Sequence, residues 1–236
     1  MKFAVLLFPG SNCDDDMVHA LGRVMGRKTT KVWHKDTDLP GIGPEDCVVV
    51  PGGFSYGDYV RAGAVARFSP IMQAVSAHAE RGGRVLGICN GFQILCEAGL
   101  LPGALLRNAN QRFICQNQYL RCESTDSALT SALDLHQVVS IPIAHAEGRY
   151  HIDDDGLNDL WNNDQVLFRY CNADGVVSDI DNPNGSRDHI AGIRNKHGNV
   201  FGMMPHPERA AEDLLGNTDG KLLLKGLIES VESAVA

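Results

Sequence analysis

The chain has 236 residues, of which 44% are hydrophobic, and a formal net charge of −8. This length can bury a full core, which predicts one domain over residues 1–236. The acidic balance, without a cluster of Lys or Arg, argues against a nucleic-acid or membrane-surface partner. The seven scattered cysteines contain no Cys-x-x-Cys pair, which argues against a zinc site and favours the reducing cytoplasm.

The N-terminal half alternates predicted strands and helices. Phe3–Phe8 is predicted as a buried strand, and Ser11 or Asn12 is expected to cap the helix that follows it. The next two strands are expected at Lys31–His34 and Cys47–Val50. A chain that alternates strands with helices favours a parallel, doubly wound sheet.

A helix over 70–80 leads to a further strand at Val85–Ile88. The loops at 9–12, 51–57 and 89–91 each follow one of the predicted strands. Ligands of parallel sheets bind at the carboxyl ends of the strands, so these three loops are expected to converge.

The C-terminal half changes character and is expected to add antiparallel strands to the same sheet. Its predicted strands, with few helices between them, are 113–122, 137–144, 165–171, 190–194 and Val200–Met204. Residues 145–163 are expected to be a loop, either a solvated surface loop or one facing a partner, and Leu222–Val231 has the spacing of a terminal helix. The predicted fold class is therefore α/β, with a single doubly wound, mostly parallel sheet and an antiparallel extension.

Cys89 is the first candidate for a catalytic residue. It lies between Gly87 and Gly91 where an apolar strand stops and a helix over Asn90–Glu97 is expected to begin. A sharp strand-to-helix turn of this kind presents a nucleophile, and the start of the helix favours a thiolate. A buried structural cysteine is the alternative.

His206 and Glu208 could supply the base and its orienting partner. They follow the predicted strand Val200–Met204, and residues i and i+2 of an extended segment point the same way. The Glu208 carboxylate is therefore expected beside the His206 ring, as a thiol nucleophile requires. A solvent-facing histidine in a turn is the alternative.

After a nucleophile and a base, the third requirement for attack on a carbonyl is a site that binds the oxyanion. Attack on a carbonyl creates a negative oxygen that backbone N–H groups must receive. The N–H of Asn90 follows the nucleophile, and Gly52 and Gly53 follow a neighbouring strand and could turn an N–H toward the site. The alternative for the two glycines is an ordinary turn.

With Cys89, His206 and Glu208 in this order, the chain resembles the class I, or triad, glutamine amidotransferases. Within that class it is most similar to the glutaminase subunits of phosphoribosylformylglycinamidine synthase, an enzyme of purine biosynthesis. The motifs that carry the resemblance are Phe8–Asp14, Pro51–Asp58, Gly87–Gln93 and Met204–Arg209.

The resemblance implies a flavodoxin-like fold and one type-1 amidotransferase domain over 1–236. It implies that Cys89 is the nucleophile, that His206 is the general base and acid, and that Glu208 orients His206. The substrate-binding and oxyanion residues implied by the family are Gly52, Gly53, Asn90 and Gln93. An ordinary helix-surface residue is the alternative for Gln93.

The resemblance also implies a reaction and partners. Glutamine would be hydrolysed to glutamate and ammonia through a cysteine thioester, and the ammonia would pass to a large, ATP-dependent synthetase subunit in IMP biosynthesis. A small accessory subunit is expected as well. The chain has no Gly-x-x-x-x-Gly-Lys-Ser/Thr loop, so ATP and Mg²⁺ are expected on the synthetase subunit and no cofactor or metal on this chain.

Three other interpretations stay open from the sequence. The chain could be a triad amidotransferase serving a different synthase, which binding to candidate synthetases would test. It could be a stand-alone cysteine hydrolase or peptidase, which an assay against peptides and free glutamine would separate. It could also be a non-catalytic scaffold or metal-binding module, which would not react with a thiol-directed glutamine analogue.

Overall fold

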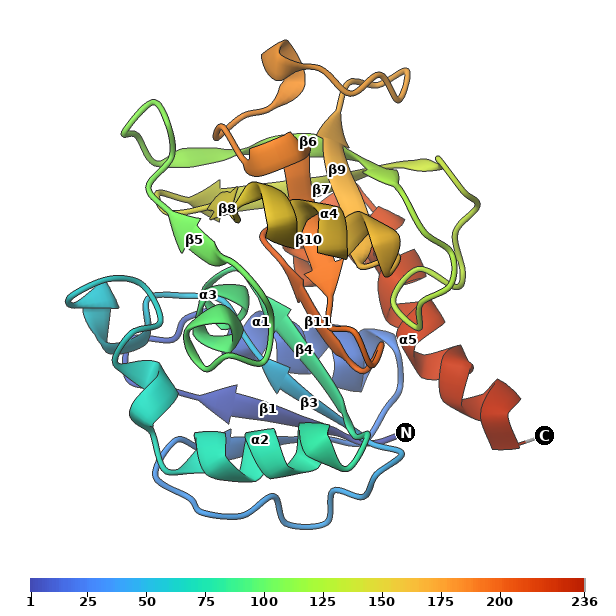
Figure 1. Cartoon of the computed structure of the whole chain (residues 1–236). Coiled ribbons are helices and arrows are strands. Elements are labelled where there is room, and N and C mark those ends of the chain that lie inside the picture. The colour runs from blue at the N-terminus through green and yellow to red at the C-terminus, as the bar shows by residue number, and fades with distance from the viewer. Residues whose placement is uncertain (236) are drawn as a thin grey trace.

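The structure is a computed structural model that describes the backbone of residues 1–235 and the side chains of residues 1–230. A nine-stranded sheet with the order β2-β1-β3-β4-β11-β10-β9-β6-β7 runs through the molecule (Figure 1). Its parallel half consists of β1 (Phe3–Leu7), β2 (Thr29–Trp33), β3 (Cys47–Val50), β4 (Arg84–Ile88) and β11 (Val200–Met203).

The parallel half has the strand order of the flavodoxin-like folds. Its helices are α1 (Asp14–Val18), which continues as a π-helix over His19–Val24, α2 (Ile71–Glu80) and α3 (Asn90–Glu97). In Figure 1, α2 and α3 lie in front of the strands and α1 lies behind them. Helices on both faces bury all four residues of β3, as its continuous apolar sequence predicts.

The antiparallel half consists of β6 (Ile114–Cys122), β7 (Val138–His145), β9 (Val166–Cys171) and β10 (Ile190–Arg194). Buried and half-buried residues alternate along β7, as in a sheet with one covered face. Helix α5 (Asp219–Val235) contacts β7 and buries Leu223 and Leu227. The side chain of Val231, in the predicted terminal helix, lies outside the described residues.

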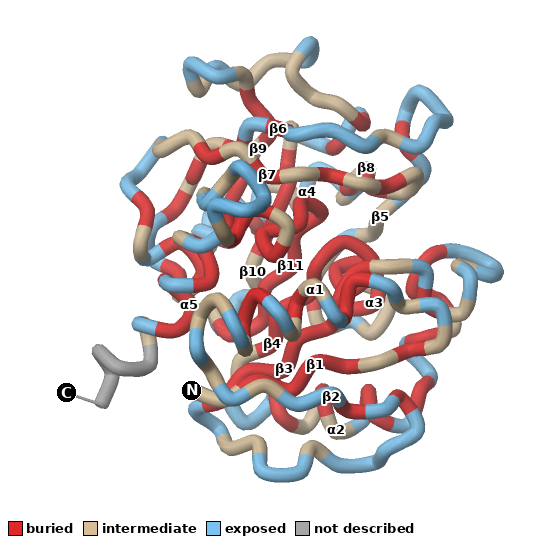
Figure 2. Tube along the Cα trace, turned by 180° about the vertical axis from the view of Figure 1, so that it is seen from behind, coloured by how far each residue is buried: buried red, intermediate tan, exposed pale blue. Residues whose placement is uncertain are grey.

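Short 3-10 helices occupy several connections: Ser55–Asp58, Ala66–Phe68, Asp179–Asp181, Arg187–His189, Pro207–Ala210 and Asp213–Leu215. The central strands of the sheet are mostly buried in both halves, whereas the edge strand β2 is mostly exposed (Figure 2). The α/β fold class, with a doubly wound sheet and an antiparallel extension, is confirmed. No helix among the described residues has the length and apolar character needed to cross a membrane.

The expectation of a loop over 145–163 is wrong. The segment contains β8 (Arg149–His151), which pairs with β5 (Ala104–Leu106), and α4 (Asp154–Asn162). Asp153 caps α4 by accepting a hydrogen bond from the N–H of Gly156. The acidic run is therefore the favourable first turn of a helix, not a solvated loop.

The expected cap of α1 is also wrong. Cys13 occupies the N-cap position, and no side chain caps this helix. Ser11 instead donates its hydroxyl proton to the carbonyl of Gly52 at 3.2 Å, and Ser11 forms a bridge with Gly53. The loop after β1 is thereby joined to the loop after β3, as the predicted convergence requires.

Candidate active site

Cys89 lies at the turn between β4 and α3, with backbone angles φ 51° and ψ −105°. A positive φ is uncommon for a residue with a side chain and indicates a strained turn. A Cβ atom on Gly91 would lie 1.8 Å from the carbonyl oxygen of Val50, and one on Gly87 would lie 2.8 Å from that of Gly91. A side chain at position 87 or 91 would therefore collide with the backbone around this turn.

The Cys89 thiol is buried beside the start of α3. The residue is 5% exposed, and its sulfur lies 3.7 Å from the carbonyl oxygen of Ala144. Its backbone N–H donates to the carbonyl of Met203 at 2.8 Å, which fixes the turn to β11. The first N–H groups of α3 have no acceptor within the helix, so they are available to a developing negative charge.

His206 and Glu208 form a buried pair directly after β11. The Nδ1 atom of His206 lies 2.7 Å from Oε1 of Glu208, and both side chains are at most 1% exposed. The predicted contact is present, but it is made by the 3-10 turn Pro207–Ala210 and not by an extended segment. Within the described residues, Nε2 of His206 has no hydrogen-bond partner.

The charge state of His206 is set by its neighbours. Burial alone would lower the pKa of His206, but the Glu208 carboxylate, followed by Cys89 and Cys13, raises this pKa well above 6.5. His206 therefore favours the imidazolium form. A protonated imidazole next to a thiol stabilises the thiolate, which is the reactive form of cysteine.

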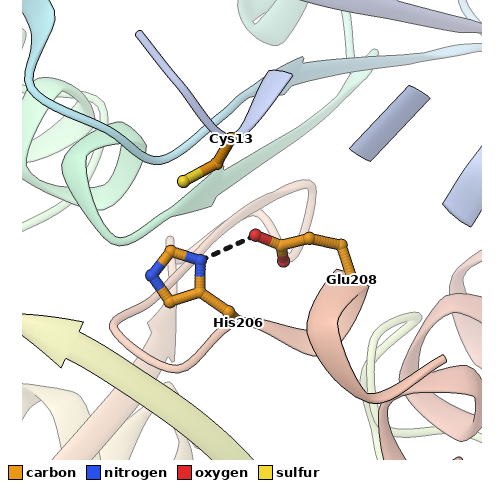
Figure 3. A group of neighbouring side chains, drawn as sticks. All are labelled: Cys13, His206 and Glu208. Carbon is orange, nitrogen blue, oxygen red and sulfur yellow. Dashed lines mark hydrogen bonds and ion pairs between the residues drawn. The ribbon is translucent and has the colours of Figure 1, made fainter. Parts of the chain in front are cut away.

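Cys13 is a member of the site that sequence reasoning missed. Its sulfur, a nitrogen of His206 and a carboxylate oxygen of Glu208 lie within 4.8 Å of one another (Figure 3). These donor types also bind zinc, but Nη2 of Arg209 lies 3.1 Å from the Cys13 sulfur, and its positive charge opposes a cation there. Cys13 directly follows the loop at 9–12, which was expected to reach the site. This position is the signal that could have identified it.

Gly52 lies against the catalytic candidates, and Gly53 lies against the loop after β1. A Cβ atom on Gly52 would lie 2.7 Å from Cε1 of His206 and 3.4 Å from Cβ of Cys89. Gly53 has φ +126°, and a Cβ atom there would lie 2.6 Å from the backbone nitrogen of Asn12. Packing therefore requires glycine at both positions, and their oxyanion role stays a prediction.

Asn90 and Gln93 are buried on the first turn of α3, at 2% and 5% exposure. The Asn90 amide donates to Oε1 of Gln93 at 2.9 Å and to Oδ1 of Asp58 at 3.0 Å. Gln93 donates to the carbonyl of Glu147 at 2.6 Å. Gln93 is therefore not an ordinary helix-surface residue. Asp58 and Glu147 join this network, although neither residue stands out individually in the sequence.

His145 is a second buried histidine near the site. Burial, and then the charge of His206, lowers the pKa of His145 to about 4. Asn108 faces Nδ1 of His145 at 3.2 Å and accepts a hydrogen bond from the N–H of Gly148 at 3.0 Å. Asn108 thus orders the turn between β7 and β8 that carries Glu147.

Comparison with known proteins agrees with this geometry. Residues 1–221 match the family model described as a CobB/CobQ-like glutamine amidotransferase domain. The match covers most of the chain, including Cys89, His206 and Glu208. The fold and the match together define the class of this protein as a glutamine amidotransferase.

Individual relatives show to which family within this class the chain belongs. The chain is 53% identical to the phosphoribosylformylglycinamidine synthase subunit PurQ of Gloeobacter violaceus over 100% of both chains. It is 56% identical to that of Moorella thermoacetica, with 97% of this chain and 96% of the relative covered. A solved structure of PurLQS from Thermotoga maritima aligns with a TM-score of 0.85 and 43% identity over 98% of each chain. The chain therefore belongs to the PurQ family of phosphoribosylformylglycinamidine synthase subunits.

Proposed function

We propose that this chain hydrolyses glutamine at Cys89 and delivers the ammonia to the synthetase subunit of phosphoribosylformylglycinamidine synthase in purine biosynthesis. The observation that carries this proposal is the buried His206–Glu208 pair, at 2.7 Å, beside the strained turn of Cys89. A nucleophile, a base and an orienting carboxylate are the three groups that amide hydrolysis through a thioester needs.

The reaction begins with attack of the Cys89 thiolate on the side-chain amide carbon of glutamine. The raised pKa of His206 keeps a proton on its ring, which His206 gives to the departing ammonia. A thioester to Cys89 remains. His206 then takes a proton from water, which attacks the thioester and releases glutamate, and Cys89 is restored.

The tetrahedral intermediates place a negative charge on the former amide oxygen. The N–H of Asn90, at the first position of α3, and the N–H of Gly53 are the donors that we assign to this oxygen. The dipole of α3 adds to their effect, because its positive end points toward the same turn.

The use of the ammonia requires partners. The relative from Thermotoga maritima is described as PurLQS. We propose by analogy that this chain acts with a large synthetase subunit and a small accessory subunit, and that ATP and Mg²⁺ bind to the synthetase. Free ammonia is lost if it is released without a consumer, so we expect low glutaminase activity alone and higher activity in the complex.

A glutaminase assay of the wild type and the Cys89→Ala variant, each with and without the synthetase subunit, tests the proposal. We expect glutamate release only with Cys89 and a higher rate with the synthetase. Far-ultraviolet circular dichroism of the variant verifies folding. Hydrolysis that persists in a folded Cys89→Ala variant contradicts the assignment, and equal turnover with and without the synthetase contradicts the coupling.

A further inference from the structure

Two cysteines approach each other beside Gly52. A Cβ atom on Gly52 would lie 3.2 Å from the sulfur of Cys13 and 3.4 Å from Cβ of Cys89. Both distances start at the same point, so the Cys13 sulfur is at most about 6.6 Å, the sum of the two, from Cβ of Cys89. Because glycine places no side chain at this point, residue 52 does not hold the two thiols apart by a side chain of its own.

A disulfide between Cys13 and Cys89 is within reach of local movement. Disulfide sulfurs are about 2 Å apart, and the Cβ atoms that carry them are about 4 Å apart. Rotation of a cysteine between staggered χ1 rotamers moves its sulfur by about 3 Å. Cys13 lies at the N-cap of α1, and its thiol donates to Oδ1 of Asn12 at 3.3 Å, a weak hydrogen bond. Side-chain rotation with a small shift of the loop at 9–12 therefore brings the two sulfurs together.

Positive charge lies next to the Cys13 sulfur. Nη2 of Arg209 donates to this sulfur at 3.1 Å, and Nε of Arg209 pairs with Asp16 at 3.2 Å. The sulfur also points toward the ring of His206 (Figure 3), which favours the imidazolium form. A cationic neighbour stabilises the negative sulfur that attacks in thiol–disulfide chemistry. Cys13 is therefore placed to act as a nucleophile toward Cys89.

Most of the other cysteines are poor partners for Cys89. Burial raises the pKa of Cys47 to about 12 and the pKa of both Cys122 and Cys171 to about 11. Burial also raises the pKa of Cys96. A thiol that keeps its proton at neutral pH is a weak nucleophile. Cys115 is exposed and is the competitor that an experiment must exclude.

We propose that a peroxide oxidises Cys89 and that Cys13 then closes a disulfide with it, which reversibly stops glutamine hydrolysis. This inference rests on the proposed glutaminase function, because a path that admits glutamine to Cys89 also admits the smaller peroxide. Cys13 is thus the resolving thiol of the site. The disulfide withdraws Cys89 from further oxidation to the sulfinic acid, which thiol reductants do not reverse.

The two steps balance in atoms and electrons. The Cys89 thiolate attacks one oxygen of hydrogen peroxide, so that an S–O bond forms, the O–O bond breaks, and the leaving hydroxide takes a proton from His206 and departs as water. The Cys13 thiol then gives its proton to His206, and its sulfur attacks the sulfenic sulfur of Cys89. The S–S bond forms, the S–O bond breaks, and the second hydroxide leaves as water with that proton. Two thiols are oxidised to one disulfide, and the peroxide is reduced to two molecules of water.

Mapping of the oxidised wild type tests the bond directly. The full chain is treated with an excess of hydrogen peroxide, its remaining thiols are alkylated, and it is digested without reductant. We expect a peptide pair that joins Cys13 to Cys89 with the loss of two hydrogen atoms. A Cys89 with two added oxygens and an alkylated Cys13 would overturn the proposal, and so would a Cys89 joined to any other cysteine.

Recovery of activity tests the role of Cys13. The wild type and Cys13→Ser are treated with peroxide, freed of it, and assayed with untreated synthetase subunit before and after dithiothreitol, relative to the same protein without treatment. We expect both to lose activity about 10-fold or more, because oxidised Cys89 is not a nucleophile. The wild type should recover to within about twofold, whereas Cys13→Ser should recover less than about a tenth, because its Cys89 proceeds to the sulfinic acid. Equal recovery would overturn the proposal.

Cys115→Ser is the matched control. Cys115 is exposed and pairs with Ala144, whose carbonyl oxygen lies 3.7 Å from the Cys89 sulfur, so it is the competing thiol nearest in the sheet to this contact. We expect Cys115→Ser to recover as fully as the wild type. A loss of recovery as large as that of Cys13→Ser would show that Cys13 is not the specific resolving thiol and would overturn the proposal.

The disulfide and the proposed function fail in different measurements. Hydrolysis that persists in Cys89→Ala overturns the glutaminase assignment. An active wild type that forms no bond between Cys13 and Cys89 overturns only the disulfide. Because the mapping uses the wild type alone, it decides this question even where Cys13→Ser does not fold.

Discussion

Gly52 leaves open the space that the His206 ring occupies. A Cβ atom at position 52 would lie 2.7 Å from Cε1 of His206, a separation that real Cβ atoms do not show. The same point lies 3.2 Å from the Cys13 sulfur and 3.4 Å from Cβ of Cys89. The loop after β3 therefore controls how closely the base can approach the nucleophile.

Replacement of Gly52 by Ala tests this relationship. The added methyl group must displace His206, and a displacement of about 1 Å is expected to lower kcat/KM for glutamine about 100-fold. Initial rates measure the effect, and thermal unfolding shows whether the variant is folded. A folded Gly52→Ala variant with wild-type activity would mean that the ring has another acceptable position.

Glu208→Gln is expected to change activity and pH dependence together. Glu208 is the main group that raises the pKa of His206, so its neutralisation favours the uncharged ring and should lower kcat on the order of 10³-fold. A pKa that is raised in the folded state adds stability below the ordinary value of 6.5, and this stability is lost as the pH rises through the folded value.

The difference in free energy of unfolding between the wild type and Glu208→Gln should therefore be larger near pH 6.5 than at alkaline pH. Urea unfolding at a series of pH values from 6.5 upward measures this difference. A difference that grows with pH would show that the carboxylate does not stabilise the imidazolium.

Asn108→Ala is expected to destabilise the turn between β7 and β8. Asn108 is fully buried, and its loss leaves His145 and the N–H of Gly148 without partners. We expect a loss of about 2–4 kcal/mol in the free energy of unfolding, because buried polar groups without partners are costly. Asn110→Ala, at an exposed position of the same segment, should change it by less than about 0.5 kcal/mol. Similar losses at both positions would contradict this account.

The strands and the nucleophile turn were predictable because their signals are local. The apolar run of β3 and the pair Gly87 and Gly91 report burial and close packing within a few residues of the chain. Predicted strands that contain few polar residues accordingly agree with the structure to within about two residues.

The contacts of Cys13, Asp58 and Glu147 were not predictable in the same way. Each lies in a connection between strands and helices that reaches the site only because of the order of the strands in the sheet, which local pattern does not encode. The contact of His206 with Glu208 was predicted from alternation in an extended segment, yet a 3-10 turn makes it. The predicted contact is therefore correct, although the backbone conformation from which it was predicted is wrong.

The pairing of β4 with β11 has a consequence for the timing of activity. Ile88 and Met203 are direct partners in this parallel pair, and Cys89 and His206 follow them. Cys89 is synthesised before the middle of the chain, whereas His206 follows β11, which is the last strand to be synthesised. A nascent chain that has not yet added β11 holds a nucleophile without a proton acceptor. Ammonia release therefore requires that the chain has been synthesised through His206 and that β11 has paired with β4.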